Sequence, residues 1–316
     1  MKSYFARIAL FSLIFLSLFT TQITAQPDTL SLLHVTDLHT IFNLDIYQQD
    51  MAKSRGHYGQ GVEPARQFLQ TMPRKTNSDM VIVTGDLVDF FKGETPDGGM
   101  LGFQVEQFNR VADDCTVPLW LTLGNHDVAD YAWGDSGMVS VKSVAGEARA
   151  AWVRSIPCFK DGTYYSKVVQ AGQTTFRFLF LDNGFNAVMP GDNIEMPYVD
   201  KAQLHWLEDQ LQQSDDDIEV VFMHIPLRSK GPGLEPSSEL YRVLAKTPSV
   251  KLIVAGHNHQ NAVTVFQAQG NHAITQVQTG AFARDNQNWR LIRLTNDQII
   301  VSFPGKTEKE LVINAN

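Results

Sequence analysis

Short apolar runs rich in β-branched residues recur along the chain, and each has the length and composition of a buried strand. They are Leu30–Thr36, Met80–Thr84, Leu119–Leu123, Phe176–Leu181, Glu219–Met223 and Lys251–Ala255. Apolar residues at helical spacing lie between several of them, at Val105–Ala112, Ala145–Ser155, Lys201–Gln213 and Ser237–Ala245. Strands that alternate with helices predict an α/β fold.

The last third of the chain has a different pattern, in which strand-like runs are separated by short polar turns. These runs are Ala262–Ala268, His272–Gln278, Trp289–Leu294 and Gln298–Phe303. They predict a meander of antiparallel strands, so the sheets should be mixed. Four segments rich in Gly, Asp or Asn are expected to be long loops, namely Asn43–Gly61, Phe91–Gly102, Ala129–Ser143 and Asn183–Val199. Long loops inside a compact domain are more often functional than accidental.

The N-terminus has the pattern of a secretory signal peptide. Lys2 and Arg7 precede an apolar run from Ile8 to Phe19, and Ala25 follows shortly afterwards. We expect cleavage after Ala25, although the residue at the minus-three position is the larger Ile23. The alternatives are an uncleaved anchor and a buried core helix, but the run is shorter than the roughly 20 residues that span a bilayer. The sequence thus predicts a signal peptide over residues 1–25 and an exported protein, periplasmic or secreted.

The mature chain, residues 26–316, is expected to be one domain without a transmembrane segment. It keeps 24 basic and 34 acidic residues, a formal charge of −10. This charge disfavours a nucleic-acid polymer or an anionic membrane as partner. Cys115 and Cys158 either form a disulfide in an oxidising compartment or are unrelated buried thiols. The oligomeric state is not determined by any of these features.

Side chains that commonly bind metals directly follow five of the apolar runs. They are Asp37 and His39, Asp86 after Gly85, Asn125 with His126 and Asp127 after Gly124, His224, and His257 and His259 after Gly256. Ligand-binding crevices of α/β sheets form at the carboxyl ends of strands. In an extended segment residues i and i+2 point the same way, so Asp37 and His39 are expected to reach one ion, and likewise His257 and His259.

Each motif alone is a weak signal, since a lone His-x-His is usually a surface pair and Gly-Asp an ordinary turn. The complete ordered set, each member after a strand, resembles the calcineurin-like metallophosphoesterase family. The family pattern is Asp-x-His, Gly-Asp, Gly-Asn-His-Asp/Glu, a His after a strand, and Gly-His-x-His, and the resemblance reaches about Ala281. It implies a four-layer α/β/β/α sandwich with two mixed β-sheets and a dimetal site at the carboxyl ends of strands.

The resemblance also implies how the ligands divide between two metal ions. The first ion would take Asp37, His39, Asp86 and His259, and the second would take Asp86, Asn125, His224 and His257. A shared carboxylate reduces the repulsion between two nearby cations. Imidazole and carboxylate ligands suit divalent or trivalent Mn, Fe or Zn, and neither Cys adjoins a motif.

The chemistry implied is hydrolysis of a small phosphate ester by in-line attack of a metal-bound hydroxide. His126 is the expected proton donor to the leaving oxygen. Asp127 would orient the His126 ring, or would instead be a helix-cap or turn residue. The sequence thus predicts a metal-dependent phosphoesterase, with phosphodiesters favoured. The alternatives are a phosphomonoesterase or nucleotidase on the same site, or a non-catalytic protein that binds phosphorylated ligands.

Asp89 distinguishes this chain from the purple acid phosphatases, which have Tyr at the corresponding position. The motif Gly85-Asp86-Leu87-Val88-Asp89 looks closer to the cyclic-nucleotide phosphodiesterase-like branch. Asp89 could support a ligand, but a solvated loop acid is the favoured interpretation. Contacts to substrate could come from loop residues, each of which is more simply an exposed or packing residue. These candidates are Arg55, His57, Tyr58, Trp133, Arg228, Phe282 and Arg284.

Overall fold

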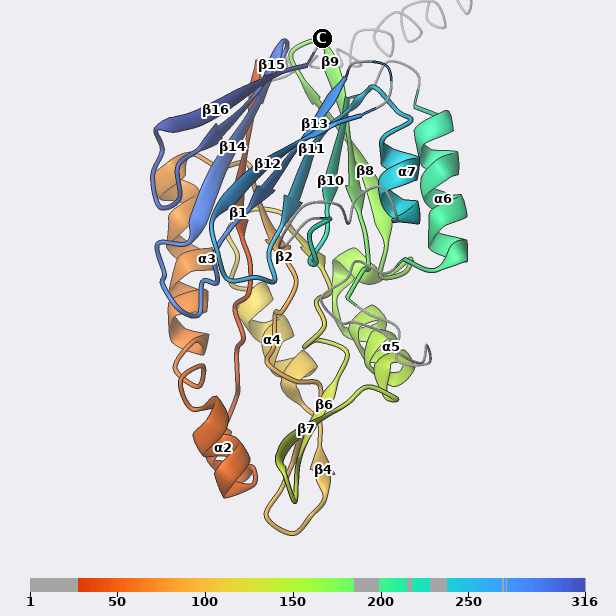
Figure 1. Ribbon diagram of the computed structural model, residues 1–316. Coiled ribbons are helices and arrows are strands. Elements are labelled where there is room, and N and C mark those ends of the chain that lie inside the picture. Colours follow the sequence, from red (N-terminus) through yellow and green to blue (C-terminus); the bar gives the residue numbers. More distant parts are fainter. Residues whose placement is uncertain are drawn as a thin grey trace, which may run out of the picture.

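Two six-stranded β-sheets pack face to face at the centre of the molecule, and helices cover their outer faces (Figure 1). The computed structural model describes residues 28–184, 199–214, 218–227, 238–268, 270 and 272–315. The predicted signal peptide, most of the predicted loop at Asn183–Val199, and Arg228 lie outside these residues.

The first sheet has the order β16-β15-β14-β1-β2-β5. Its strands are β1 (Thr29–Val35), β2 (Met80–Thr84), β5 (Leu119–Thr122), β14 (Trp289–Thr295), β15 (Gln298–Ser302) and β16 (Lys309–Asn314). β1, β2 and β5 are parallel, whereas β14 pairs antiparallel with β1 and continues into the β15–β16 hairpins. The parallel strands therefore direct their carboxyl ends to one edge.

The second sheet has the order β12-β13-β11-β10-β9-β8. Its strands are β8 (Tyr165–Ala171), β9 (Thr174–Phe180), β10 (Ile218–Phe222), β11 (Val250–Ala255), β12 (Ala262–Gln267) and β13 (Ala273–Gln278). The four inner strands β9, β10, β11 and β13 are parallel to one another. The edge strands β12 and β8 pair antiparallel with β13 and β9. Both sheets are mixed, as predicted.

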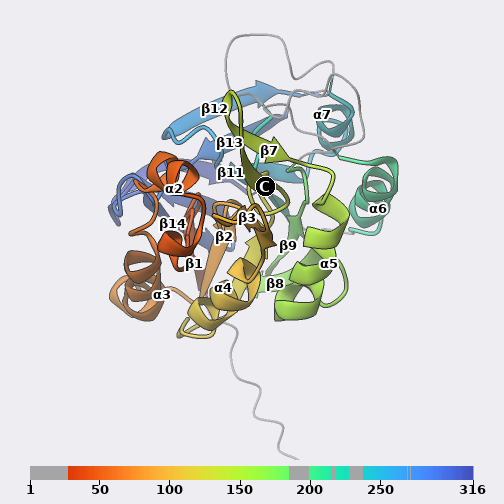
Figure 2. The same cartoon turned by 90° about the horizontal axis from the view of Figure 1, so that it is seen from below.

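Helices form the two outer layers (Figure 2). α3 (Val62–Thr76), α4 (Gln104–Ala112) and α5 (Ala145–Ser155) cover the first sheet, where Phe68 and Phe108 join its core. α6 (Lys201–Gln212) and α7 (Glu239–Leu244) cover the second sheet. The predicted four-layer α/β/β/α sandwich is confirmed.

Strand β10 shows why the apolar runs are continuous rather than alternating. Val220 and Phe222 face the core between the sheets, whereas Val221 and Met223 face the core beneath α6 and α7. All four side chains are fully buried. A strand buried on both faces needs apolar residues at every position, which is the pattern that predicted these strands.

A small module lies beyond one end of the large sheets, where Figure 1 shows α2 and the strands β4, β6 and β7. It comprises η1 (Leu44–Ile46), α2 (Gln49–Arg55) and a four-stranded sheet in the order β4-β3-β6-β7. The strands are β3 (Gly93–Glu94), β4 (Met100–Leu101), β6 (Asp130–Gly134) and β7 (Gly137–Val141). Its core contains Tyr47, Met51, Tyr58, Phe90 and Tyr131. Three segments predicted as loops therefore contain regular structure.

Two further expectations need correction. The predicted single meander is split, because β12 and β13 form a hairpin in the second sheet while β14, β15 and β16 extend the first. Cys115 and Cys158 are both free, so the alternative of a disulfide is wrong. A 3-10 turn, η2 (Pro157–Phe159), holds Cys158.

Candidate metal centre

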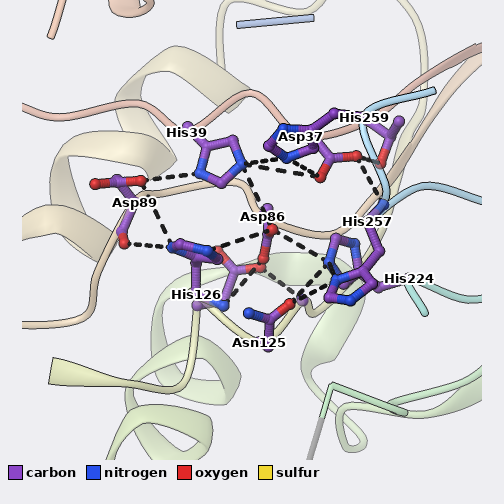
Figure 3. Close-up of polar contacts among 12 residues, drawn as sticks. Asp37, His39, Asp86, Asp89, Asn125, His126, His224, His257 and His259 are labelled. Atoms are coloured by element: carbon purple, nitrogen blue, oxygen red, sulfur yellow. Dashed lines mark hydrogen bonds and ion pairs between the residues drawn. The ribbon is translucent and has the colours of Figure 1, made fainter. Parts of the chain in front are cut away.

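The five strand ends meet at one place, and all seven predicted ligands lie together there (Figure 3). In the first sheet, Asp37 and His39 follow β1, Asp86 follows β2, and Asn125 follows β5. In the second sheet, His224 follows β10, and His257 and His259 follow β11. Residues far apart in sequence are in contact, since His39 Nε2 lies 3.2 Å from His259 Nε2. The centre thus joins the two sheets.

Two overlapping sets of ligand atoms share one carboxylate. Asp37, His39, Asp86 and His259 form the first set, and Asp86, His224 and His257 form the second, with the ligand atoms in each within 4.8 Å of one another. Asn125 completes the second, because its Oδ1 lies 3.1 Å from His224 Nε2 and 3.0 Å from His257 Nδ1. The two sets contain the residues that were predicted for each ion, with Asp86 in both.

The tautomers of two histidines leave lone pairs directed into the centre. His224 Nδ1 lies 2.8 Å from the carbonyl oxygen of Thr84, which can only accept, so Nδ1 carries the proton and Nε2 does not in the neutral ring. His39 Nδ1 lies 2.9 Å from Asp89 Oδ1 and is fixed in the same way. Partners of this kind commonly orient histidines that bind metals.

The centre has negative charge and one buried acceptor atom without a hydrogen bond, both of which a cation would satisfy. Asp37 Oδ1 is buried and accepts no hydrogen bond. Burial opposes protonation of His224, but the charge of Asp86 outweighs it and raises the pKa of His224 to about 9. Converging lone pairs, a buried oxygen without a hydrogen bond and a local demand for positive charge are what two ions of the Mn, Fe or Zn type require, so the residues fit the expected metals.

The ligand residues lie in sharp turns, whereas extended backbone was predicted for Asp37–His39 and His257–His259. Asp37, His39, Asp86, His257 and His259 all have positive φ, with values of 54°, 42°, 50°, 72° and 56°. This left-handed conformation is uncommon for residues other than glycine and is found where the surrounding structure enforces it. The ligands of each pair do converge, but through sharp turns and not through continuing strands.

Two glycines allow the ligand segments to approach each other. A Cβ atom at Gly124 would lie 2.2 Å from Asp86 Oδ1. A Cβ at Gly256 would lie 2.0 Å from Thr36 Oγ1 and 2.4 Å from Asp37 Oδ2. Side chains cannot be accommodated at these distances, which explains why Gly precedes the ligands in both motifs.

His126 lies at the border of the centre, and hydrogen bonds at Nδ1 fix the orientation of its ring. Its Nδ1 is 2.9 Å from the backbone oxygen of Asp89 and 2.9 Å from Tyr131 Oη, while its Nε2 lies 4.0 Å from Asp86 Oδ2. The carbonyl fixes the Nδ1 proton, so Nε2 is the atom free to exchange protons with a bound molecule. Burial, partly offset by the charge of Asp86, lowers the pKa of His126.

Asp127 does not orient the His126 ring. Its Oδ1 accepts from the amide of Val88 at 2.9 Å and its Oδ2 from the amide of Gly124 at 2.7 Å. Burial, and after it the charge of Asp86, raises the pKa of Asp127 to about 8. The carboxyl therefore ties the Gly124 turn to the segment after β2, which is the turn-residue alternative.

Asp89 is fully buried, so its interpretation as a solvated loop acid is wrong. It binds His39 Nδ1 with Oδ1, and its Oδ2 accepts from Arg55 Nε at 2.6 Å. Burial opposes its charge, but the bonds from Arg55 and His39 hold the pKa of Asp89 well below its usual range. The signal in the sequence for a buried Asp89 was the apolar pair Phe90-Phe91 that follows it. Its partner Arg55 lies in a segment that was predicted as a loop.

The other loop candidates differ in what they contact. Arg55 and Tyr58 support the centre, since the Tyr58 ring stacks on His39 with centroids 4.4 Å apart. Trp133 and Phe282 are packing residues, the former against the core of the small module and the latter against Phe68. His57 contacts Tyr58, and Arg284 is exposed.

Comparisons with known proteins agree with this geometry. A family model described as calcineurin-like phosphoesterase matches residues 30–261. The 3′,5′-cyclic-nucleotide phosphodiesterase of Nostoc sp. is 21% identical over 244 residues, which cover 73% of this chain and 72% of that protein. A dimetal phosphatase from Danio rerio has the same fold, with a TM-score of 0.61 at 15% identity over 92% of this chain and 100% of that one. GAP50, the anchor in the inner membrane complex of Plasmodium, gives a TM-score of 0.50 at 14% identity over 90% of this chain and 87% of that one.

Proposed function

Because the chain belongs to the calcineurin-like phosphoesterase family, we propose that it is an exported enzyme that hydrolyses small phosphodiesters in preference to monoesters. It is a metal-dependent hydrolase of phosphate esters. The preference for diesters is supported by the relative from Nostoc sp., a cyclic-nucleotide phosphodiesterase that aligns with most of the chain.

The observation that carries the proposal is the pair of ligand sets that share Asp86. Metal ions held there would lower the pKa of water and neutralise charge on phosphoryl oxygens. The chain contributes a fixed geometry, because Asp89 and the Thr84 carbonyl hold the rings of His39 and His224 so that their Nε2 atoms face inward. These contacts remove the cost of orienting the ligands when an ion binds.

His126 supplies the proton for the departing oxygen. Its Nδ1 is occupied by the Asp89 carbonyl and Tyr131, so its Nε2 is directed at the centre beside Asp86. The neutral ring carries its single proton on Nδ1, and only the imidazolium can therefore donate from Nε2. Among the described residues, His126 is the imidazole at the centre that belongs to neither dimetal ligand set.

Export is supported by the N-terminal pattern of two basic residues, an apolar run and Ala25. Within the described ranges, no helix combines the length and apolarity needed to cross a membrane. The acidic charge of the chain favours a small substrate that enters the centre over a polyanion that must cover the surface.

The test of activity uses the purified chain with Mn²⁺, Fe²⁺ or Zn²⁺ and two chromogenic substrates, bis(p-nitrophenyl) phosphate and p-nitrophenyl phosphate. We expect faster turnover of the diester, loss of both activities in Asp86→Asn, and retention in the matched exposed variant Asp161→Asn, whose side chain is 80% exposed. Faster turnover of the monoester would contradict the preference, and no turnover of either substrate or of a nucleotide panel would contradict the activity.

The test of export is separate. The full chain is expressed with its leader, cells are fractionated, and the N-terminus of the product is sequenced. A product that begins at Gln26 outside the cytoplasm is expected. A cytoplasmic product that still begins at Met1 would contradict export without bearing on the activity.

A further inference from the structure

Asn183 follows β9 and is fully buried beside the second ligand set. Because β9 pairs with β10, the segment after β9 runs next to the segment that carries His224. Asn183 is not one of the predicted metal ligands, and it begins a segment that was predicted only as a long loop. Its contacts nevertheless connect it to the metal centre.

The side-chain amide of Asn183 makes three hydrogen bonds to the backbone around His224. Its Oδ1 accepts from the amides of His224 and Ile225, each at 3.1 Å, and its Nδ2 donates to the backbone oxygen of Ile225 at 2.6 Å. A primary amide offers both the acceptor and the donor that this backbone needs, whereas a carboxylate offers acceptors alone. The backbone at His224 is therefore fixed separately from its ring, which the Thr84 carbonyl orients at Nδ1.

Gly184 brings the same segment into contact with the turn that carries Asn125. A Cβ atom at Gly184 would lie 2.9 Å from the backbone oxygen of Gly124 and 3.3 Å from the amide nitrogen of Asn125. Asn183 and Gly184 thus adjoin two segments whose side chains meet at the centre, where Asn125 Oδ1 lies 3.1 Å from His224 Nε2 (Figure 3). A shift of this segment would displace two ligands of the second set together.

Asp182 holds the segment to both outer layers of the sandwich. Its Oδ2 accepts from Arg149 Nε of α5 and from Thr163 Oγ1, both at 2.6 Å, and its Oδ1 accepts from Arg149 Nη2 at 2.9 Å. Gln203 of α6 binds the backbone of Asp182, donating to its oxygen and accepting from its amide, each at 2.9 Å. Helix α5 covers the first sheet and α6 the second, so the position of Asn183 is fixed from both sides.

The first ligand set is supported by different residues. Asp89 binds His39 and is itself bound by Arg55. Among the described residues, no hydrogen bond joins Asn183 to a ligand that belongs to the first set alone. Support of the two sets is therefore divided, with Arg55 and Asp89 on one side of the centre and Asn183 on the other.

We propose that Asn183 is a positioning residue for the second ion, and that its loss weakens metal binding at the second ligand set while leaving the first set nearly unchanged. The proposal rests on the proposed function only in taking the second ion to be needed for hydrolysis. Without the Asn183 side chain, the buried amides of His224 and Ile225 lose their acceptor, and the His224 backbone is no longer fixed. Loss of a partner that orients a metal ligand costs about 10-fold to 100-fold in affinity.

The first experiment measures metal binding and does not depend on turnover. Mn²⁺ is titrated by calorimetry into the metal-free chain in two backgrounds, His259→Ala, which removes a ligand of the first set, and His257→Ala, which removes one of the second. We expect Asn183→Ala to weaken binding about 10-fold to 100-fold in the His259→Ala background, where the second set is complete, and to change little in His257→Ala. Asn314→Ala, exposed on the edge strand β16, is the matched control and should change neither affinity.

The second experiment separates positioning from folding. Asn183→Ala should lose kcat at limiting Mn²⁺ and recover it at saturating Mn²⁺, because every ligand is still present. Asn183→Asp keeps an acceptor for the two amides and loses the donor to Ile225, so its Mn²⁺ affinity should fall between those of wild type and Asn183→Ala. If circular dichroism shows that Asn183→Ala does not fold, Asn183→Asp decides the comparison of the two backgrounds.

Two outcomes would overturn the assignment. One is equal Mn²⁺ affinity with and without the Asn183 substitution in the His259→Ala background, and the other is an equal loss in both backgrounds. A selective loss at the second set, in a chain whose wild type hydrolyses no ester, would support the assignment and overturn the proposed function instead.

Discussion

The guanidinium of Arg55 and the carboxylate of Asp89 form a two-point ion pair in which Nε lies 2.6 Å from Oδ2 and Nη2 binds Oδ1. Arg55 ends α2, and Asp89 lies beneath the centre, so the pair ties the small module to the ligand His39. The guanidinium also lies 4.8 Å from the centroid of the Tyr58 ring and 5.4 Å from that of Tyr131. Each of these rings contacts a histidine of the site, so Arg55 supports both His39 and His126.

Removal of this ion pair should reduce turnover without unfolding the chain. We expect Arg55→Ala to lower kcat about 10-fold to 100-fold, the range found when a partner that orients a metal ligand is lost. Lys53→Ala is the matched control, because Lys53 lies on the same helix in an exposed pair with Asp50. Kinetics, circular dichroism and metal content check the result. Added guanidinium ion should partly restore the activity of Arg55→Ala. A normal kcat in Arg55→Ala would show that the pair is only structural.

His126→Ala should lower kcat by about 10²-fold or more, because a proton donor contributes factors of this size. The effect should depend on the leaving group. p-Nitrophenolate leaves without a proton, so its esters should lose less activity than esters of alkyl alcohols. Metal content, measured by elemental analysis, should stay close to that of wild type, since His126 belongs to neither dimetal ligand set. His205→Ala on the exposed face of α6 serves as control. An equal loss for both leaving groups would contradict the role.

Gly256→Ala should destabilise the chain by about 2 kcal/mol and reduce metal binding, because the added methyl overlaps Thr36 and Asp37. Gly146→Ala makes the same chemical change in α5, where a Cβ meets no atom within 4 Å. There the change should stabilise the helix by about 0.5–1 kcal/mol. Thermal unfolding of the two variants, with and without Mn²⁺, tests the contrast. Equal melting temperatures would show that the segments around Gly256 can separate at no cost.

Asp130→Asn should stabilise the chain at alkaline pH and have little effect at acidic pH. Burial, only partly offset by Lys92, raises the pKa of Asp130 to about 6 in the folded chain. A carboxyl with a raised folded pKa contributes its stability below the unfolded pKa of about 3.9 and loses it as the pH rises through the folded pKa. Removal of the charge should therefore add about 2 kcal/mol to the free energy of unfolding at pH 8.

The matched control is Asp135→Asn, in the exposed turn that joins β6 and β7. The Asp130→Asn variant keeps a side-chain oxygen to accept from the amide of Lys92, as Asp130 does at 3.0 Å. Denaturant titrations at pH 4 and pH 8 measure the difference. An equal effect of both variants at pH 8 would contradict an origin in burial.

Local patterns predicted the α/β alternation and placed the candidate metal ligands after strands, whereas the four-layer sandwich came from the family resemblance. Phe178–Leu181 and Leu252–Ala255 are apolar at successive positions, and each predicted ligand follows a run of this kind. The small module was missed because its strands contain as few as two residues, as at Gly93–Glu94, and have no periodicity to detect. Helix α3 was overlooked although Ala65, Phe68, Leu69 and Met72 have helical spacing.

Contacts between side chains from separate segments could not be read from the sequence. Nothing local to Asp127 indicates that its carboxylate binds the amides of Gly124 and Val88 rather than the His126 ring. Similarly, the role of Asp89 depends on Arg55, 34 positions earlier. The turns at the ligands are equally hidden, since no glycine at Asp37 or His257 signals the positive φ that both residues adopt.

The ligands of the first metal set come from both ends of the folded domain, since His259 is 220 positions after His39. During synthesis, Asp37, His39 and Asp86 emerge long before the ribosome has translated their last partner. A growing polypeptide therefore cannot assemble this ion site until most of the domain exists. Loading with metal is therefore expected to be a late event in the biogenesis of this chain.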